Sequence, residues 1–141
     1  MSAGELIVQG GRIIPALRYR NAKAAIDWLG KAFGFEAKMV VPGEGDHIAH
    51  AELVLGNGMV MLGDAETEYS YLVGPPVPGQ PVTQGLYVVV DNVDGHYARA
   101  KSEGAEILLD LKTQDYGGRD YTARDLEGHV WTFGSYDPWA S

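Results

Sequence analysis

The hydrophobic and polar positions of this chain follow one pattern that occurs twice. After Asn21, apolar side chains recur every three or four residues as far as Phe33, which predicts an amphipathic helix with one buried face. After Asn92, a thinner stripe with the same spacing continues to Ala100. Each stripe follows a short apolar run and precedes three strand-like segments. We therefore expect the unit β-α-β-β-β twice.

The residues at the ends of both predicted helices agree with this division. An asparagine side chain accepts hydrogen bonds from the free N–H groups of a first helical turn, and Asn21 and Asn92 stand at such positions. Gly34 and Gly104 stand where a helix ends in a left-handed residue. The strands are then expected at residues 13–19, 36–41, 48–55 and 59–62 in the first unit, and at 86–90, 106–111, 121–124 and 130–136 in the second.

A nearly constant spacing relates the two units. The segment KAFGFE begins at Lys31 and the segment KSEGAE begins at Lys101, 70 residues later. The turn glycines of LGNGMVMLG and DLEGHVWTFG, Gly58 and Gly128, are also 70 residues apart, whereas the two capping asparagines are 71 apart. We therefore expect one residue to be missing from the second helix and the register to be kept elsewhere.

The repeat predicts one domain with two terminal tails. Between the repeated units lies a segment with four of the seven prolines, which is too many for a helix or a central strand. This segment is expected to be an inter-module linker. The expected ranges are 12–63 for module one, 64–84 for the linker, 85–136 for module two, 12–136 for the whole domain, and 1–11 and 137–141 for the tails.

Composition excludes several classes of function. The 141 residues include no cysteine, which rules out disulfides, thiolate metal sites and cysteine nucleophiles. The net charge of −8 provides no cationic footprint for a nucleic acid. No apolar run approaches the roughly 20 residues of a membrane-spanning helix, and the N-terminal residues do not resemble a signal peptide. We expect a cytoplasmic protein with neither a nucleic-acid nor a membrane partner.

Four segments together resemble a known superfamily over nearly the whole chain from Arg12 to Tyr136. They are IIPALRYRNAKAAIDWLGKAFGFEA, IAHAELVLGNGMVML, GLYVVVDNVDGHYARAKSEGAEI and YGGRDYTARDLEGHVWTFGSY. The chain resembles the vicinal oxygen chelate superfamily of glyoxalase I, extradiol dioxygenases, fosfomycin-resistance enzymes and bleomycin-resistance proteins, and most of all its PhnB-like branch. The resemblance implies an α+β fold in which tandem βαβββ modules form a glyoxalase/bleomycin-resistance/dioxygenase-like open barrel. It also implies a cavity between the modules and a homodimer.

The resemblance further implies where a divalent metal ion would bind in the metalloenzymes of this superfamily. Its ligands come from the first and last strands of the modules and are imidazole or carboxylate groups. The corresponding positions in this chain are Ile14, Leu62, Gly85 and Thr132. None of these side chains is a suitable ligand. We therefore expect no metal at the usual place and no other cofactor.

Alternation along the strands predicts which side chains line the cavity. Ala51, Leu53, Tyr121 and Ala123 are expected on the helix-covered side of the sheets. The opposite, concave side is expected to present the ligand-binding residues Arg18, His50, Glu52, Tyr87, Asp120, Thr122, Arg124 and Thr132. Such a mixture of apolar surface and a few polar groups is typical of a site for a small organic molecule.

His50 and Glu52 leave two alternatives open. Two residues apart on one strand face, they are suited to general acid–base catalysis or to an unusual metal site. Alternatively, Glu52 neutralises Arg18 or Arg124 across the cavity, because buried charges are normally paired. The remaining motifs have structural explanations: His96 is expected to pack in the core, His129 to form a turn hydrogen bond, and the glycines of YGGR to form a hairpin turn.

Three functions are consistent with these residues. The first is metal-independent binding of a small molecule, with sequestration of a cationic or aromatic compound such as an antibiotic. The acidic net charge favours a basic ligand in that case. The second is a lyase, isomerase or dioxygenase that uses an atypical metal site or the catalytic candidates His50 and Glu52. The third is a dimeric interaction module without a ligand.

Overall fold

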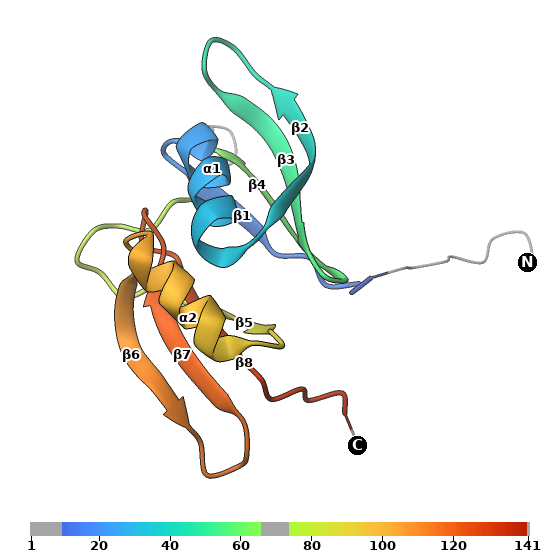
Figure 1. Cartoon of the computed structure of the whole chain (residues 1–141). Coiled ribbons are helices and arrows are strands. Elements are labelled where there is room, and N and C mark those ends of the chain that lie inside the picture. The colour runs from blue at the N-terminus through green and yellow to red at the C-terminus, as the bar shows by residue number, and fades with distance from the viewer. Residues whose placement is uncertain (1–9, 66–73, 141) are drawn as a thin grey trace, which may run out of the picture.

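The computed structural model describes residues 10–65 and 74–140, and within them it confirms the doubled β-α-β-β-β unit (Figure 1). The first unit contains β1 (Ala16–Tyr19), α1 (Ala22–Phe33), β2 (Glu36–Pro42), β3 (Ile48–Leu55) and β4 (Gly58–Asp64). The second contains β5 (Gly85–Val89), α2 (Val93–Ser102), β6 (Glu106–Thr113), β7 (Arg119–Arg124) and β8 (Val130–Gly134).

Each unit forms its own four-stranded sheet with the same strand order. The orders are β1-β4-β3-β2 and β5-β8-β7-β6, and in each sheet the first strand pairs in parallel with the last one of its unit. All other pairs are antiparallel. The fold is therefore α+β with tandem βαβββ modules, as the sequence predicts. Residues 1–9 of the expected N-terminal tail and 66–73 of the expected linker lie outside the described residues.

Three predicted boundaries differ from the structure. The first strand begins at Ala16 rather than at residue 13, because Pro15 has no N–H to donate to a ladder. The last strand ends at Gly134 rather than at residue 136. Asp64, assigned to the linker by sequence, belongs to β4, where it pairs with Tyr19. Its carboxylate accepts a hydrogen bond from Ala22 N at 3.0 Å, so this buried residue also supports the start of α1.

The predicted helix ends are confirmed. The Asn21 side chain accepts from Ala24 N at 3.1 Å, and the Asn92 side chain accepts from Gly95 N at 3.1 Å. Gly34 follows α1 with φ of 88°, a left-handed conformation that costs glycine little. The two helices are also short. Among the described residues, no helix has the length and apolarity that crossing a bilayer requires.

Both helices belong to one hydrophobic core. α1 and α2 lie side by side, each over its own sheet (Figure 1). Phe33, the last residue of α1, has its ring centroid 4.6 Å from that of Phe133 and 5.7 Å from that of Trp131, both on β8. The core of module one is thus continuous with the helix-covered face of the second sheet. The other face of each sheet lies away from this core.

Two charged residues of module two hold the two ends of α1. Glu127 accepts hydrogen bonds from the backbone N–H groups of Arg20 and Asn21, at 2.6 and 2.8 Å, just before the helix begins. At the other end, the Arg99 guanidinium donates to the carbonyl oxygens of Lys31 and Gly30, at 2.6 and 2.8 Å. An anion at a helix N-terminus and a cation at its C-terminus both stabilise the helix dipole.

His96 connects α2 to α1 and to the second sheet, as a packed residue. Its Nε2 lies 2.8 Å from Phe33 O and therefore carries the proton, so Nδ1, 2.6 Å from the Tyr121 hydroxyl, accepts from it. Burial, together with the charge of Arg99, lowers the pKa of His96 below 6.5, although the Phe33 carbonyl opposes this shift. The ring is thus held neutral.

Lowering the pH should therefore destabilise the fold through His96. Below pH 6.5 the unfolded chain binds a proton at this residue that the folded chain does not, so the free energy of unfolding falls as the pH drops through this window. In urea unfolding at pH 7.5 and 5.5, His96→Gln should lose less stability than the parent protein over the same interval. Equal losses would show that His96 does not contribute to the pH dependence.

Candidate functional site

The faces opposite the helices carry the predicted ligand-binding residues. We call the face of the first sheet trough A and that of the second sheet trough B. Cross-strand partners share a face, and Glu52 on β3 pairs with Met39 on β2 and Met61 on β4, while His50 pairs with Val41. Trough A therefore consists of Arg18, Met39, Val41, His50, Glu52 and Met61. By the same register, trough B consists of Tyr87, Leu109, Asp120, Thr122, Arg124, Val130 and Thr132.

In trough A, His50 and Glu52 form a close pair. His50 Nε2 lies 3.0 Å from Glu52 Oε2, and both side chains are partly exposed. Arg18 lies on the neighbouring part of the face, where a Cβ on Gly63 would come within 2.6 Å of the Arg18 guanidinium. Gly63 thus leaves the space that the guanidinium occupies. The pair is arranged to hold a proton between an imidazole and a carboxylate.

The expected pairing of Glu52 with Arg124 is wrong. Arg124 Nη1 lies 2.6 Å from Glu106 Oε2, on the adjacent strand of its own sheet. Glu106 and Arg124 are direct cross-strand partners in the β6–β7 register, so the pair forms within module two. The charge of Glu52 is instead balanced locally, by its contact with His50.

In trough B, a pair of hydroxyl groups occupies the centre of the sheet. The Oγ1 atoms of Thr122 and Thr132 are 2.7 Å apart, and Tyr87 is the partner of Thr132 on the other side of β8. At one end of the same face, Asp120 accepts a hydrogen bond from the Tyr116 hydroxyl at 2.7 Å. This hydrogen bond is the main reason that the pKa of Tyr116 rises to about 12.

Leu62 does not face a trough, contrary to the position that the sequence comparison between the modules assigned to it. Leu62 is buried and pairs with Leu17 and Ala51 on the helix-covered face. Met61 occupies the trough position that Thr132 has in module two, 71 residues later. Among the described residues, no three His, Asp or Glu side chains are close enough to share a metal ion.

A difference in hairpin length explains the shift. In module one, four residues separate the partners Val54 and Met59, whereas in module two five residues separate Arg124 and Val130. The turn before β8 therefore has one more residue than the turn before β4. The expectation that the register is kept after α2 is wrong for the last strand, and counting from the turn glycines fails for that reason.

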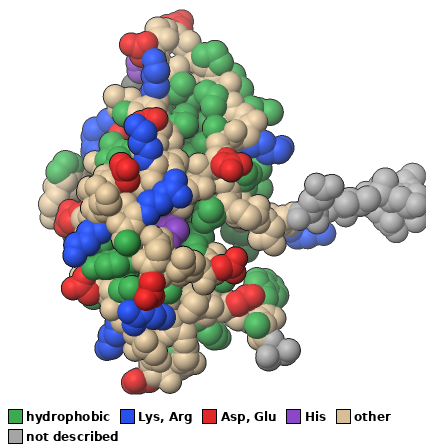
Figure 2. All heavy atoms as spheres, in the orientation of Figure 1, with side chains coloured by type: hydrophobic (Ala, Val, Ile, Leu, Met, Phe, Trp, Pro, Cys, Tyr) green, Lys and Arg blue, Asp and Glu red, His purple; other side chains and the backbone are tan. Residues whose placement is uncertain are grey.

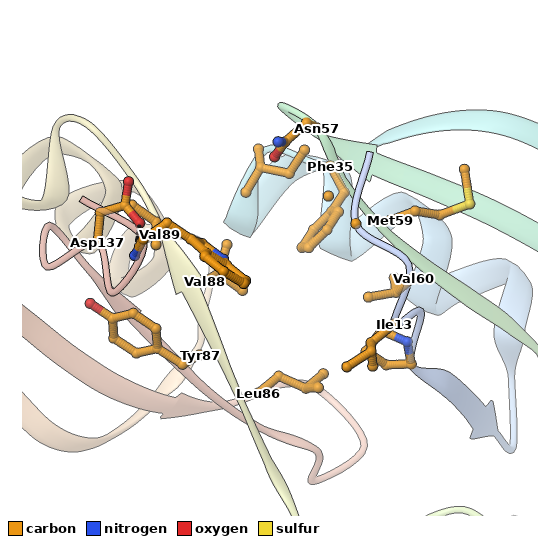
Figure 3. A pocket seen from close by; sticks show the side chains of 15 residues that line it. Ile13, Phe35, Asn57, Met59, Val60, Leu86, Tyr87, Val88, Val89 and Asp137 are labelled. Carbon is orange, nitrogen blue, oxygen red and sulfur yellow. Dashed lines mark hydrogen bonds between the residues drawn. The ribbon is translucent and has the colours of Figure 1, made fainter. Parts of the chain in front are cut away.

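A cleft of about 620 Å³ lies between the two modules, away from the centres of the troughs. Figure 3 shows Leu86, Tyr87 and Val88 on one side of it, and Phe35, Val60 and Ile13 on the other. Of the eight predicted ligand-binding residues, only Tyr87 lines this cleft. Strand alternation did not predict it, because the cleft is formed where the edges of the two sheets approach each other.

Within one chain, the predicted site residues remain on two separate open faces. Arg18, His50 and Glu52 lie in trough A, and the other five lie in trough B. Both faces expose large hydrophobic side chains, with exposed fractions of 46% for Met39, 42% for Val41 and 65% for Leu109. Figure 2 shows hydrophobic side chains gathered over the region of β2 and β3. Exposed apolar side chains on a concave face indicate that something covers them.

The family comparison matches most of the chain. Residues 13–133 match the family model of the Glyoxalase/Bleomycin resistance protein/Dioxygenase superfamily. Among curated proteins, an uncharacterised protein of Mycobacterium bovis is 32% identical over 123 residues, which cover 85% of this chain and 80% of that protein. An uncharacterised protein of Mycobacterium tuberculosis has the same identity and covers 71% of its own length.

Solved structures have the same fold. TioX from Micromonospora sp. ML1 is 36% identical, with a TM-score of 0.71 over 89% of this chain and 98% of that one. The fosfomycin resistance protein FosX from Listeria monocytogenes has a TM-score of 0.65 over 90% of this chain and 92% of its own. At 11% identity, the likeness to FosX concerns the fold alone.

Proposed function

Because the chain belongs to the glyoxalase/bleomycin resistance protein/dioxygenase superfamily, we propose that it binds and sequesters a small organic molecule without a metal ion. The observation that carries the proposal is the composition of the two troughs, where hydrophobic side chains surround a few hydroxyl and charged groups. Thr122 and Thr132 place two hydroxyls 2.7 Å apart at the centre of trough B. Such surfaces bind organic ligands and lack the ligands of a metal site.

A homodimer would complete the site. Trough A and trough B lie on separate faces of one chain, and each exposes large apolar side chains such as Val41 and Leu109. In the proposed dimer, trough A of one protomer lies opposite trough B of the other, and the ligand occupies the space between them. This arrangement buries both apolar faces and brings His50 and Glu52 close to Thr122 and Thr132. The PhnB-like branch remains a prediction.

The ligand is proposed to be cationic or aromatic. The chain has nineteen acidic and eleven basic residues, so its field attracts cations. Troughs A and B together contain Glu52, Asp120 and several flat or flexible apolar groups, which suit the face of an aromatic ring. Resistance to an antibiotic of this kind by sequestration is the biological role that we propose.

The proposal is tested with purified protein and a ligand panel. Light scattering should give a dimer, and elemental analysis should find no stoichiometric metal. A panel of cationic glycopeptide and aromatic antibiotics should include members that raise the melting temperature and bind below millimolar concentration. A panel without a single binder would overturn sequestration and favour the interaction module. Stoichiometric metal would overturn metal independence and favour the enzyme.

Thr132→Arg should weaken the binding of a cationic panel member at least about tenfold, because it places a large cation at the centre of trough B. Ser102→Arg, at the exposed end of α2, adds the same charge to the helix side of the molecule and serves as the matched control. Titration calorimetry of both variants measures the difference. Equal affinities for the two variants would exclude trough B as the binding surface.

The 3.0 Å contact between His50 and Glu52 favours one second candidate, an enzyme of the same superfamily. A base of this kind removes a proton from a bound substrate in a lyase or isomerase reaction. If turnover of a panel compound is found, Glu52→Gln should lower kcat about 100-fold while Kd changes little. Full activity in this variant would exclude acid–base chemistry by the pair.

A further inference from the structure

Three tyrosines and one carboxylate gather at one end of trough B. The Tyr116 hydroxyl donates to Asp120 at 2.7 Å, and the rings of Tyr116 and Tyr136 meet edge to face with centroids 5.4 Å apart. The Tyr87 hydroxyl donates to the Tyr136 carbonyl oxygen at 2.7 Å. We call these four residues the tyrosine–carboxylate cluster. It draws on β5, β7, the β6–β7 hairpin and the segment after β8.

Two glycines make room for the cluster. A Cβ on Gly134 would lie 2.5 Å from the Tyr87 hydroxyl and 2.9 Å from Asp120 Cβ. A Cβ on Gly118 would lie 2.9 Å from Tyr136 Cβ, and Gly118 also has φ of 99°, which disfavours any other residue. The glycines of the YGGR motif therefore do more than form a hairpin turn. They allow Tyr136 to approach the end of the sheet.

The carboxylate of the cluster keeps its negative charge uncompensated. Asp120 accepts from the neutral donors Gln114 Nε2, at 2.8 Å, and Tyr116, and it takes part in no ion pair among residues 10–65 and 74–140. Lys112 is its cross-strand neighbour on β6, yet its ammonium lies beyond ion-pair distance. A second carboxylate, Asp137, acts with Asp120 and with burial, the largest cause, to raise the pKa of Tyr87.

The ring surfaces of the cluster remain accessible. The exposed fractions are 40% for Tyr87, 61% for Tyr116 and 44% for Tyr136. The face of a tyrosine ring attracts a cation that comes within about 6 Å of its centroid, and the attraction grows when water is excluded. A bare carboxylate next to three partly exposed rings therefore has the chemistry of a site for a weakly hydrated organic cation.

We propose that the tyrosine–carboxylate cluster binds the alkylammonium group of a cationic ligand. The inference rests on the proposed function, and it specifies which end of trough B receives the charged part of the molecule. A trimethylated or otherwise substituted ammonium fits better than a metal ion, because the cluster offers ring faces and a single carboxylate. The apolar part of the ligand then extends along trough B towards Thr122 and Thr132.

The test uses two probes of equal shape. Choline carries a trimethylammonium group, and 3,3-dimethylbutan-1-ol carries a neutral tert-butyl group in its place. In NMR titrations of the full chain with ring-labelled tyrosine, choline should bind at least about tenfold more tightly than the alcohol. Asp120→Asn should abolish that preference. Tyr116→Leu should weaken choline binding about three- to tenfold, and Tyr116→Phe, which keeps the ring, should weaken it less.

Asp110→Asn is the matched control. Asp110 also accepts a hydrogen bond from a tyrosine hydroxyl, that of Tyr97 at 2.8 Å, but this pair lies between α2 and β6, outside the cluster. The variant removes the same charge from the chain and should keep the preference for choline. A loss in Asp110→Asn equal to that in Asp120→Asn would overturn the proposal, because net charge alone would then explain the binding.

The experiment also separates this inference from the proposed function. If aromatic panel members bind while choline and its neutral analogue bind equally, the cluster is not a cation site and sequestration stands. If choline binds at the cluster and no panel member binds, the cation site stands and sequestration falls. If neither the panel nor choline binds, both are overturned.

Discussion

Asp125→Ala should lower the free energy of unfolding by about 3–5 kcal/mol, the largest loss that we expect from a single polar residue. Asp125 is only 6% exposed, and its carboxylate accepts from the Tyr19 hydroxyl at 2.5 Å and from Trp131 Nε1 at 3.1 Å. It also accepts from the backbone N–H groups of Glu127 and His129, both at 3.0 Å. Alanine would leave these four donors without an acceptor. Urea unfolding measures the loss.

Asp27→Ala is the control for this prediction. Asp27 forms an exposed ion pair with Lys31 on α1, at 3.0 Å, so its removal should change stability by less than about 1 kcal/mol. Asp125→Asn should fall between the two variants, because an amide oxygen still accepts while its NH₂ group faces donors. A loss from Asp125→Ala no greater than that from Asp27→Ala would show that water replaces the buried carboxylate.

Phe33→Ala should cost about 3–5 kcal/mol, because it leaves a cavity where the two modules share a core. The Phe33 side chain is fully buried, and its ring lies 5.0 Å from Trp28 and 4.6 Å from Phe133, centroid to centroid. The residues on its two sides belong to different modules. The loss should therefore appear as one cooperative transition at lower denaturant concentration, measured by both fluorescence and circular dichroism.

Trp139→Ala provides the comparison for the loss of a large aromatic side chain. Trp139 is 96% exposed at the border of the inter-module cleft, so its removal should change the stability of the monomeric fold by no more than about 0.5 kcal/mol. Two separate transitions in Phe33→Ala, instead of one, would contradict a continuous core. A loss below about 1 kcal/mol would contradict the tight packing around Phe33.

Much of the fold follows from local patterns. The apolar spacing of α1, its asparagine cap and the left-handed Gly34 each determine local conformation with nearest neighbours alone, and all three are confirmed. Alternation along β3 and β7 correctly placed Ala51 and Tyr121 under the helices. Patterns of this kind are predictable because the physical cause lies within a few residues of the effect.

The errors arise where the cause lies elsewhere in the chain. Leu62 was misplaced because the hairpin before β8 contains one more residue, which no count from a glycine shows. Glu106 was not expected as the partner of Arg124, since that choice depends on the β6–β7 register. Alternation also gave no sign of Tyr116 and Tyr136 beside Asp120, because these two rings come from irregular segments.

The position of Glu127 and Arg99 at opposite ends of α1 bears on the history of the duplicated chain. A βαβββ unit that once existed alone must have satisfied its own helix ends, but this first half now depends on the second for both. Excised from the chain, it would keep its strands and lose the groups that fix its helix. The halves have become obligate companions, and a gene split between them should yield fragments that fold only when mixed.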